Sequence, residues 1–139
     1  VNARVLVIGD GPERDELAGL ELPGAREDAA QLLAAADVVV CPSRSEGFPQ
    51  VPLQAMAAGV CVVGTDVAGL REVVEHGVTG VLVPAEDPTA LAAATHARLD
   101  APARRRTLGD GGRRRLVERG LTREATVRRT LDAYRALVG

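Results

Sequence analysis

The sequence contains no lysine, so its basic residues are arginine and two histidines. This absence excludes mechanisms that need a Schiff-base lysine or the lysine of a P-loop. Aromatic residues make up only 1% of the chain, namely Phe48 and Tyr134, which leaves almost nothing for base stacking on nucleic acid or for an aromatic sugar platform. The 139 residues, 46% hydrophobic and 26% charged, have the composition of one soluble globular domain.

Cysteines and long apolar runs are also scarce. No run approaches the ~20 apolar residues of a membrane-spanning helix, and the first four residues lack the pattern of a secretory signal, so we expect a cytoplasmic protein. Cys41 and Cys61 fall at the end of one predicted strand and the start of the next, roughly 10 Å apart if the strands are parallel neighbours. We therefore expect two reduced thiols. No His, Cys, Asp and Glu cluster has metal-ligand spacing, so we expect neither a metal nor a cofactor.

Apolar runs and turn residues alternate along the chain as in a parallel α/β protein. Continuous apolar runs predict strands buried on both faces at 4–9, 37–41, 60–65 and 80–84. Helices are predicted at 27–36, 50–59, 70–75, 87–99, 104–119 and 123–138, with a short helix from residue 13 and at most a brief strand within 20–25. The run 109–112, Gly-Asp-Gly-Gly, is expected to break or fray its helix. We predict a doubly wound sheet with a ligand site at the carboxyl ends of its strands.

The net charge of -2 hides two oppositely charged halves. Up to Ala97 there are five arginines against fourteen acids, and from Arg98 onward twelve arginines against five acids. Such a basic tail has two interpretations, contact with a phosphate-bearing surface or a solvated helix face, and the second is the commoner one.

The segment that follows the second long apolar run predicts an anion site. Pro52 lacks an amide hydrogen and fits only the first turn of a helix, so that helix begins at about Gln50. The amides of Gln50 and Val51 then point out of a helix N-terminus, where the helix dipole adds positive charge. Gly47 allows close backbone approach, and together these features suit a phosphate or pyrophosphate.

Two polar side chains flank this helix start. Glu46 is negative and poorly placed to hold an anion, so we expect it to accept hydrogen bonds from hydroxyl groups on the ligand or to face a developing positive charge. Gln54 lies one turn into the helix, and helical side chains lean toward the N-terminus, so its amide can reach the same ligand. An ordinary capped helix without a ligand remains the alternative.

Six motifs then add a family resemblance. They are Gly9–Pro12, Ala35–Val38, Pro42–Phe48, Ala55–Gly59, Thr65–Gly69 with Glu72, and Gly77–Pro84. In this order they resemble the C-terminal, nucleotide-sugar-binding domain of GT-B retaining glycosyltransferases of family four. The resemblance implies a Rossmann-like donor-binding domain over residues 1–100, without its usual first strand and helix, and C-terminal helices over 101–139 packing on it.

The resemblance also implies roles for individual residues. Glu46 matches the first of the family's two glutamates and would act at the donor sugar as the catalytic residue. Gln54 occupies the place of the second, which binds the ribose hydroxyls of the nucleotide. The remaining donor-binding residues would be Gly9 and Gly11 in the nucleotide pocket, Ser43 near the nucleotide, Gly47 and Phe48 in the same loop, and the amides of Gln50 and Val51 at the diphosphate.

Three departures from the family pattern leave two functions open. Gln54 is uncharged, which would cost about 1 kcal/mol of donor binding relative to glutamate. The basic pair that neutralises the donor diphosphate is missing, as is the N-terminal acceptor-binding domain. We therefore expect either the donor-binding part of a transferase that uses a nucleoside diphosphate sugar, or a catalytically inert nucleotide-sugar-binding or interaction module derived from such an enzyme. Its partners would be the donor, the missing domain and an anionic membrane, but no nucleic acid.

Overall fold

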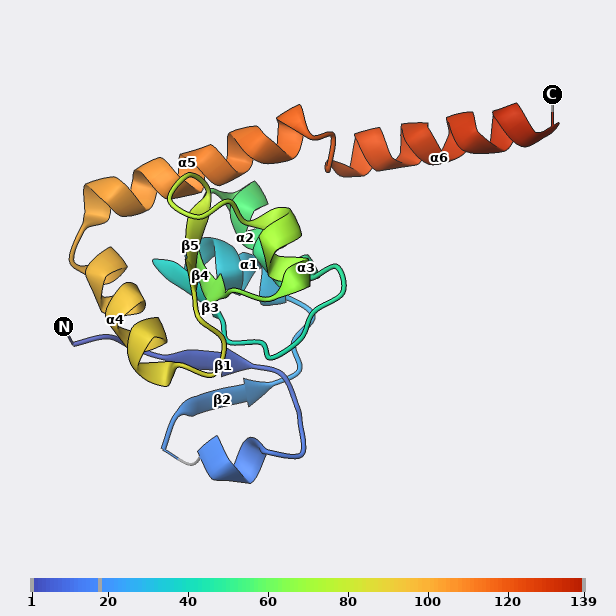
Figure 1. Cartoon of the computed structure of the whole chain (residues 1–139). Coiled ribbons are helices and arrows are strands. Elements are labelled where there is room, and N and C mark those ends of the chain that lie inside the picture. Colours follow the sequence, from blue (N-terminus) through green and yellow to red (C-terminus); the bar gives the residue numbers. More distant parts are fainter. Residues whose placement is uncertain (1, 18, 139) are drawn as a thin grey trace.

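Strands and helices alternate in the computed structural model, which describes residues 2–17 and 19–138 (Figure 1). The strands are β1 (Leu6–Ile8), β2 (Glu21–Gly24), β3 (Val38–Cys41), β4 (Cys61–Thr65) and β5 (Gly80–Val83). The helices are a 3₁₀ turn (Arg14–Leu17), α1 (Ala29–Ala35), α2 (Gln50–Ala58), α3 (Ala68–Val73), α4 (Pro88–Leu99), α5 (Pro102–Glu118) and α6 (Arg123–Val138). The predicted α/β order is confirmed, and β2 settles the ambiguous segment 20–25.

The described strands form two parallel sheets. β1 pairs with β2, and β3, β4 and β5 pair in that order. In the larger sheet Val38 lies opposite Cys61 and Cys41 lies opposite Gly64, so the two cysteines sit at opposite ends of neighbouring strands. Both thiols are buried and free, as predicted.

The expectation of strands buried on both faces holds for β4 and fails for β1. All five residues of β4 are buried, whereas Leu6 on β1 is 38% exposed and the preceding Val5 is 52% exposed. β4 has strands on both sides and helices over both faces, while β1 pairs with β2 alone. Val40 on β3, at the free edge of the larger sheet, is also 40% exposed.

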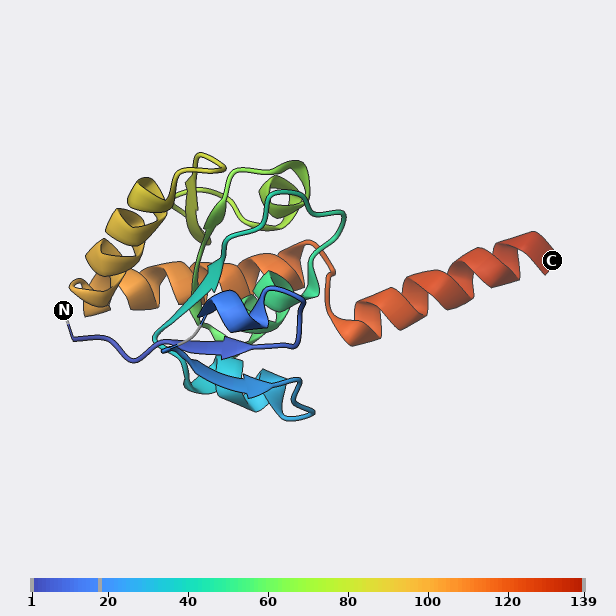
Figure 2. The same ribbon diagram turned by 90° about the horizontal axis from the view of Figure 1, so that it is seen from below.

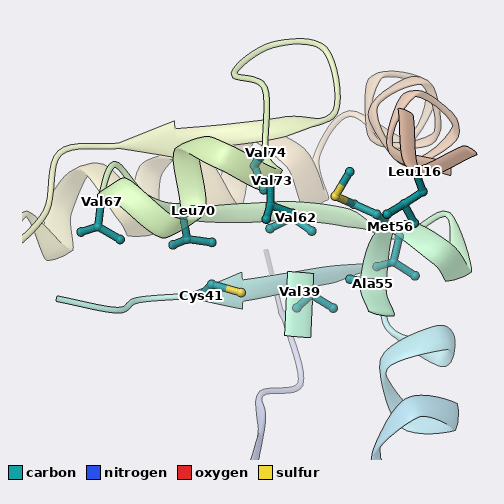
Figure 3. Close-up of a cluster of buried hydrophobic side chains, with 11 residues drawn as sticks. Val39, Cys41, Ala55, Met56, Val62, Val67, Leu70, Val73, Val74 and Leu116 are labelled. Carbon is teal, nitrogen blue, oxygen red and sulfur yellow. The ribbon is translucent and has the colours of Figure 1, made fainter. Parts of the chain in front are cut away.

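The core of the larger sheet has two sides. On one face of the sheet, residues of β3 and β4 pack against α2 and α3, as Figure 3 shows. Met56, Val62 and Leu70 are fully buried in this cluster. On the other side a cluster of Cys61, Val63, Val81, Val83 and Leu108 lies against α4. α5 contributes Leu116 to the first cluster and Leu108 to the second. The sheet is thus covered on both faces, as in a doubly wound fold.

Helix α5 is continuous, so the break predicted at residues 109–112 is wrong. Its glycines are buried because other parts of the chain lie directly against them. Gly109 faces the carbonyl of Gly59, Gly111 faces that of Val78, and a Cβ on Gly112 would lie 3.0 Å from the Cγ of Met56. The glycines therefore permit close packing of α5, which offsets their poor helix propensity.

Arginines of the basic tail bind the C-terminal ends of helices. Each of four donates to a backbone carbonyl at such an end: Arg113 to Ala58 of α2, Arg119 to Glu72 of α3, Arg105 to Leu99 of α4 and Arg129 to Arg119 after α5. A cation at this position compensates the negative end of the helix dipole and satisfies a free carbonyl. Part of the tail's positive charge therefore has a structural role.

Helix α6 extends away from the rest of the molecule in both views (Figures 1 and 2). Ala125 is the only one of its described residues that is buried. Its apolar side chains face solvent, with Leu131 49% and Tyr134 64% exposed. Helix α5, by contrast, packs on α2 and on the larger sheet.

The glycines of α5 provide a stability test. We expect Gly109→Ala to lower the free energy of unfolding by about 2 kcal/mol, because the new methyl group collides with the backbone at Gly59. Asp110→Ala, at the exposed neighbouring position, is the control and should leave stability unchanged or slightly higher. Urea unfolding followed by circular dichroism measures both. A more stable Gly109→Ala variant would contradict the close packing.

Candidate functional site

Two loops emerge at one edge of the larger sheet. The chain leaves β3 and β4 at the same edge, because these neighbouring strands are parallel. The loops after β3 and β4 are in direct contact, because Gly69 of α3 packs on the backbone of Glu46 and Gly47. The two loops therefore meet at the carboxyl ends of β3 and β4, the edge at which the sequence predicts a ligand site.

The N-terminus of α2 is open. The helix begins at Gln50, as predicted, with Pro52 buried in its first turn, and it ends at Gly59 in the left-handed conformation, φ 75°. No described side chain caps its first turn, whereas the Asp87 carboxylate accepts a hydrogen bond of 2.8 Å from the Ala90 amide in α4. The first amides of any α-helix have no intrahelical acceptor, and those of α2 are also without a side-chain cap. α1, α3 and α5 begin without such a cap as well.

The carboxylate of Glu46 is half-buried and held in one orientation. The hydroxyl of Ser43 donates to its Oε1 at 2.6 Å. The carbonyl of Ser43 in turn accepts a hydrogen bond of 2.5 Å from the hydroxyl of Thr65, at the end of β4. Ser43, expected near a nucleotide, thus orients Glu46 in this structure.

Cys41 is the buried last residue of β3, at the start of the loop that carries Glu46. Burial, and secondly the negative charge of Glu46, raise its pKa to about 11, because both disfavour the thiolate. Burial also raises the pKa of the Cys61 thiol, against the opposing charges of Arg98 and Arg105. At neutral pH both cysteines are therefore neutral core residues and poor nucleophiles.

The predicted donor-binding residues fall into two groups. Seven lie on one continuous stretch of loop and helix: Ser43, Glu46, Gly47, Phe48, Gln50, Val51 and Gln54. Phe48 and Val51 are 52% and 46% exposed, so apolar surface adjoins the open helix end. The other two, Gly9 and Gly11, lie in the segment that follows β1 of the smaller sheet.

Open space surrounds the glycines of these loops. A Cβ built at Gly9, Gly11 or Gly47 would meet no described atom within 4 Å. Packing within the chain therefore does not exclude a side chain at these positions, although Gly9 also has a φ of 139°, which favours glycine.

Thr65 and Gly69 were not predicted as site residues. Both lie in a motif that the sequence singles out, but their contacts with the Glu46 loop depend on how β4 and α3 pack beside β3. The signal that could have found them is their place in the motif at the carboxyl end of β4, the strand next to β3.

No group of three or more His, Cys, Asp and Glu side chains among them could hold a metal ion. No described helix is both long enough and apolar enough to span a membrane.

A parallel α/β fold with an open helix N-terminus at the carboxyl end of its strands defines the Rossmann-like class of nucleotide-binding domains. Residues 1–101 match the model of one family, the glycosyl transferases group 1. The chain belongs to this family. Its α/β fold matches that of GT-B glycosyltransferase structures, and helices follow the sheet at the C-terminal end of the described residues.

Individual relatives agree with this assignment. The chain is 39% identical over 115 residues to a D-inositol 3-phosphate glycosyltransferase of Thermobispora bispora, covering 83% of this chain and 26% of that protein. Among solved structures, sucrose-phosphate synthase of Thermosynechococcus elongatus is 33% identical with a TM-score of 0.85, over 96% of this chain and 38% of that one. Anabaena HepE, solved in complex with UDP, is 27% identical with a TM-score of 0.79, over 92% of this chain and 40% of that one.

This chain is much shorter than the relatives that it matches. The chain spans about a quarter of the Thermobispora relative, 26%, and 38% of the synthase structure. Most of the length of those proteins therefore has no counterpart in this chain.

Proposed function

We propose that this chain is the donor-binding part of a retaining glycosyltransferase, which moves a sugar from a nucleoside diphosphate sugar to an acceptor. The observation that carries the proposal is the open N-terminus of α2 beside the oriented carboxylate of Glu46. Anabaena HepE, which has the same fold, has been solved with UDP and with UDP-glucose. Those complexes support a nucleotide-sugar donor for this chain.

The diphosphate would lie at the start of α2. The amides of Gln50 and Val51 donate to its oxygens, and the helix dipole favours its negative charge by about 0.3–1 kcal/mol. Gly47 lets the diphosphate approach the backbone, because no described atom occupies the space beside it. In this arrangement backbone amides supply the hydrogen bonds that a lysine would otherwise supply.

Glu46 would face the sugar rather than the phosphates. As a carboxylate it accepts hydrogen bonds from sugar hydroxyls, and it stabilises the positive charge that develops at the anomeric carbon as the bond to the diphosphate breaks. The hydrogen bond from Ser43 occupies Oε1 and keeps the carboxylate in place during this step.

Gln54 would bind the ribose. It lies on the exposed side of α2, one turn after Gln50, and its side chain leans back toward the helix N-terminus. An amide oxygen accepts a hydrogen bond from a ribose hydroxyl without the added strength that a carboxylate charge gives. Gly9 and Gly11 would line the nucleotide pocket, and Phe48 would contribute apolar surface to it.

An inert binding module derived from such an enzyme is the second candidate. The uncharged Gln54 favours it, since the residue that holds the ribose lacks the charge typical of the family. A module that binds a nucleotide sugar would hold it at the same loop and helix without transferring the sugar, whereas an interaction module would transfer no sugar and need not bind a nucleotide.

The other partners are part of the same proposal. The acceptor would be held by a domain outside these 139 residues, and the protein would work in the cytoplasm. Contact between the basic tail and an anionic membrane stays a prediction. Membrane contact would depend on the positive charge of the tail. Part of that charge already lies at helix ends, through the contacts of Arg105, Arg113, Arg119 and Arg129.

Nucleotide binding tests the site residue by residue. In calorimetric titrations of the full-length protein with UDP and GDP, we expect Gln54→Ala to weaken binding. Gln54→Glu should strengthen it about fivefold, because a charged acceptor adds about 1 kcal/mol to the bond with ribose. Glu46→Ala should mainly weaken the binding of the corresponding nucleotide sugar. Binding that all three variants leave unchanged would remove these assignments.

Sugar transfer separates the two candidate functions. We expect the full-length protein to transfer sugar to an acceptor and the isolated 139-residue chain to transfer none, because the acceptor side lies outside it. Turnover assays with radiolabelled nucleotide sugars measure both. A full-length protein that binds donor without any transfer would establish the inert module instead, and transfer by the isolated chain would contradict the division of the site.

A further inference from the structure

The loop that carries Glu46 is attached to the neighbouring strand by a buried hydroxyl. Thr65 is the last residue of β4 and is 5% exposed. Its hydroxyl donates to the carbonyl of Ser43 at 2.5 Å and lies 3.4 Å from the carbonyl of Cys41, the last residue of β3. A buried hydroxyl without a partner is costly, so this contact favours one path for the chain as it leaves β3.

Gly69 holds the same loop from the side of α3. It is buried, and a Cβ built on it would lie 2.5 Å from the carbonyl oxygen of Glu46. α3 cannot easily move away, because the adjacent Leu70 is fully buried in the core. A side chain at position 69 would therefore displace the Glu46 loop rather than the helix.

The two contacts act on one carboxylate. Thr65 fixes the backbone of Ser43, the hydroxyl of Ser43 donates to Oε1 of Glu46 at 2.6 Å, and Gly69 sets how closely the backbone of Glu46 approaches α3. The position of the carboxylate is thus determined by β4 and α3 as well as by its own loop.

We propose that Thr65 and Gly69 are positioning residues that place the carboxylate of Glu46 for its contact with the donor sugar. The effect on the sugar rests on the proposed function, whereas the effect on the loop does not. Neither residue needs to touch the ligand, because each acts through the backbone of the Glu46 loop.

The experiment compares Thr65→Val, which keeps the shape and removes the hydroxyl, with Thr65→Ser, which keeps the hydroxyl. Gly69→Ala is compared with Ala68→Ser at the exposed neighbouring position. In the full-length protein, hydrogen exchange of peptides covering residues 42–50 reports the loop directly. Dissociation constants for UDP and UDP-glucose, or for GDP and GDP-mannose if calorimetry shows that guanosine nucleotides bind, report the contribution of the sugar.

We expect Thr65→Val and Gly69→Ala to speed exchange in the loop more than in the rest of the chain. Because Gly47 lies in the same loop, both should also bind the nucleoside diphosphate more weakly, but they should lose about tenfold more in the additional affinity due to the sugar and lose on the order of 100-fold in kcat. Thr65→Ser and Ala68→Ser should behave like the parent. If Thr65 only filled space, the Thr65→Val variant, which keeps the shape, would behave like the parent, and the Thr65→Ser variant, which keeps only the hydroxyl, would not.

The outcomes separate two failures. If Thr65→Val and Gly69→Ala leave both loop exchange and the sugar-dependent affinity at parent values, the positioning role is overturned. If loop exchange rises while the parent protein binds neither nucleotide, the effect on the loop is supported and the proposed function fails. If loop exchange rises and sugar-dependent affinity is unchanged, Glu46 does not contact the sugar and the proposal is overturned.

Discussion

The parallel pairing of β3 and β4 is the constraint on which the rest of the structure depends. Because Cys41 lies opposite Gly64, the chain leaves both strands at the same edge of the sheet, and Thr65 reaches the backbone of Ser43. α2 then starts at Gln50 with its N-terminus open, and Glu46 stands beside it. A shift of this register by one residue would reverse the alternation of side chains and would separate the hydroxyl from the loop.

The elements could be predicted from local patterns, whereas their packing could not. Pro52 and Gly59 mark the two ends of α2 because proline and a left-handed glycine act within one turn of the chain. The glycines of α5 misled the prediction, since propensity does not reveal that Gly109 lies against Gly59. Likewise the apolar run in β1 does not reveal that the strand pairs with β2 alone and stays exposed.

The candidate site also contains residues that the sequence predicts and residues that only the packing reveals. The residues on the loop and helix from Ser43 to Gln54 could be found because they are contiguous and their spacing has a direct physical meaning. Thr65 and Gly69 could not be found as partners of Glu46, because their contacts cross from one strand–helix unit to the next. The charge asymmetry indicated a surface role for the basic tail, yet Arg113 and Arg119 bind helix ends, which only a folded chain brings near them.

The central claim is that the open end of α2 holds the diphosphate of a nucleotide-sugar donor and that Glu46 faces the sugar. A crystal structure of the full-length protein with a bound nucleoside diphosphate sugar tests it most directly. The account predicts diphosphate oxygens within hydrogen-bond distance of the Gln50 and Val51 amides, with the ribose at Gln54 and the sugar at Glu46. A diphosphate bound at any other place on the chain would contradict it.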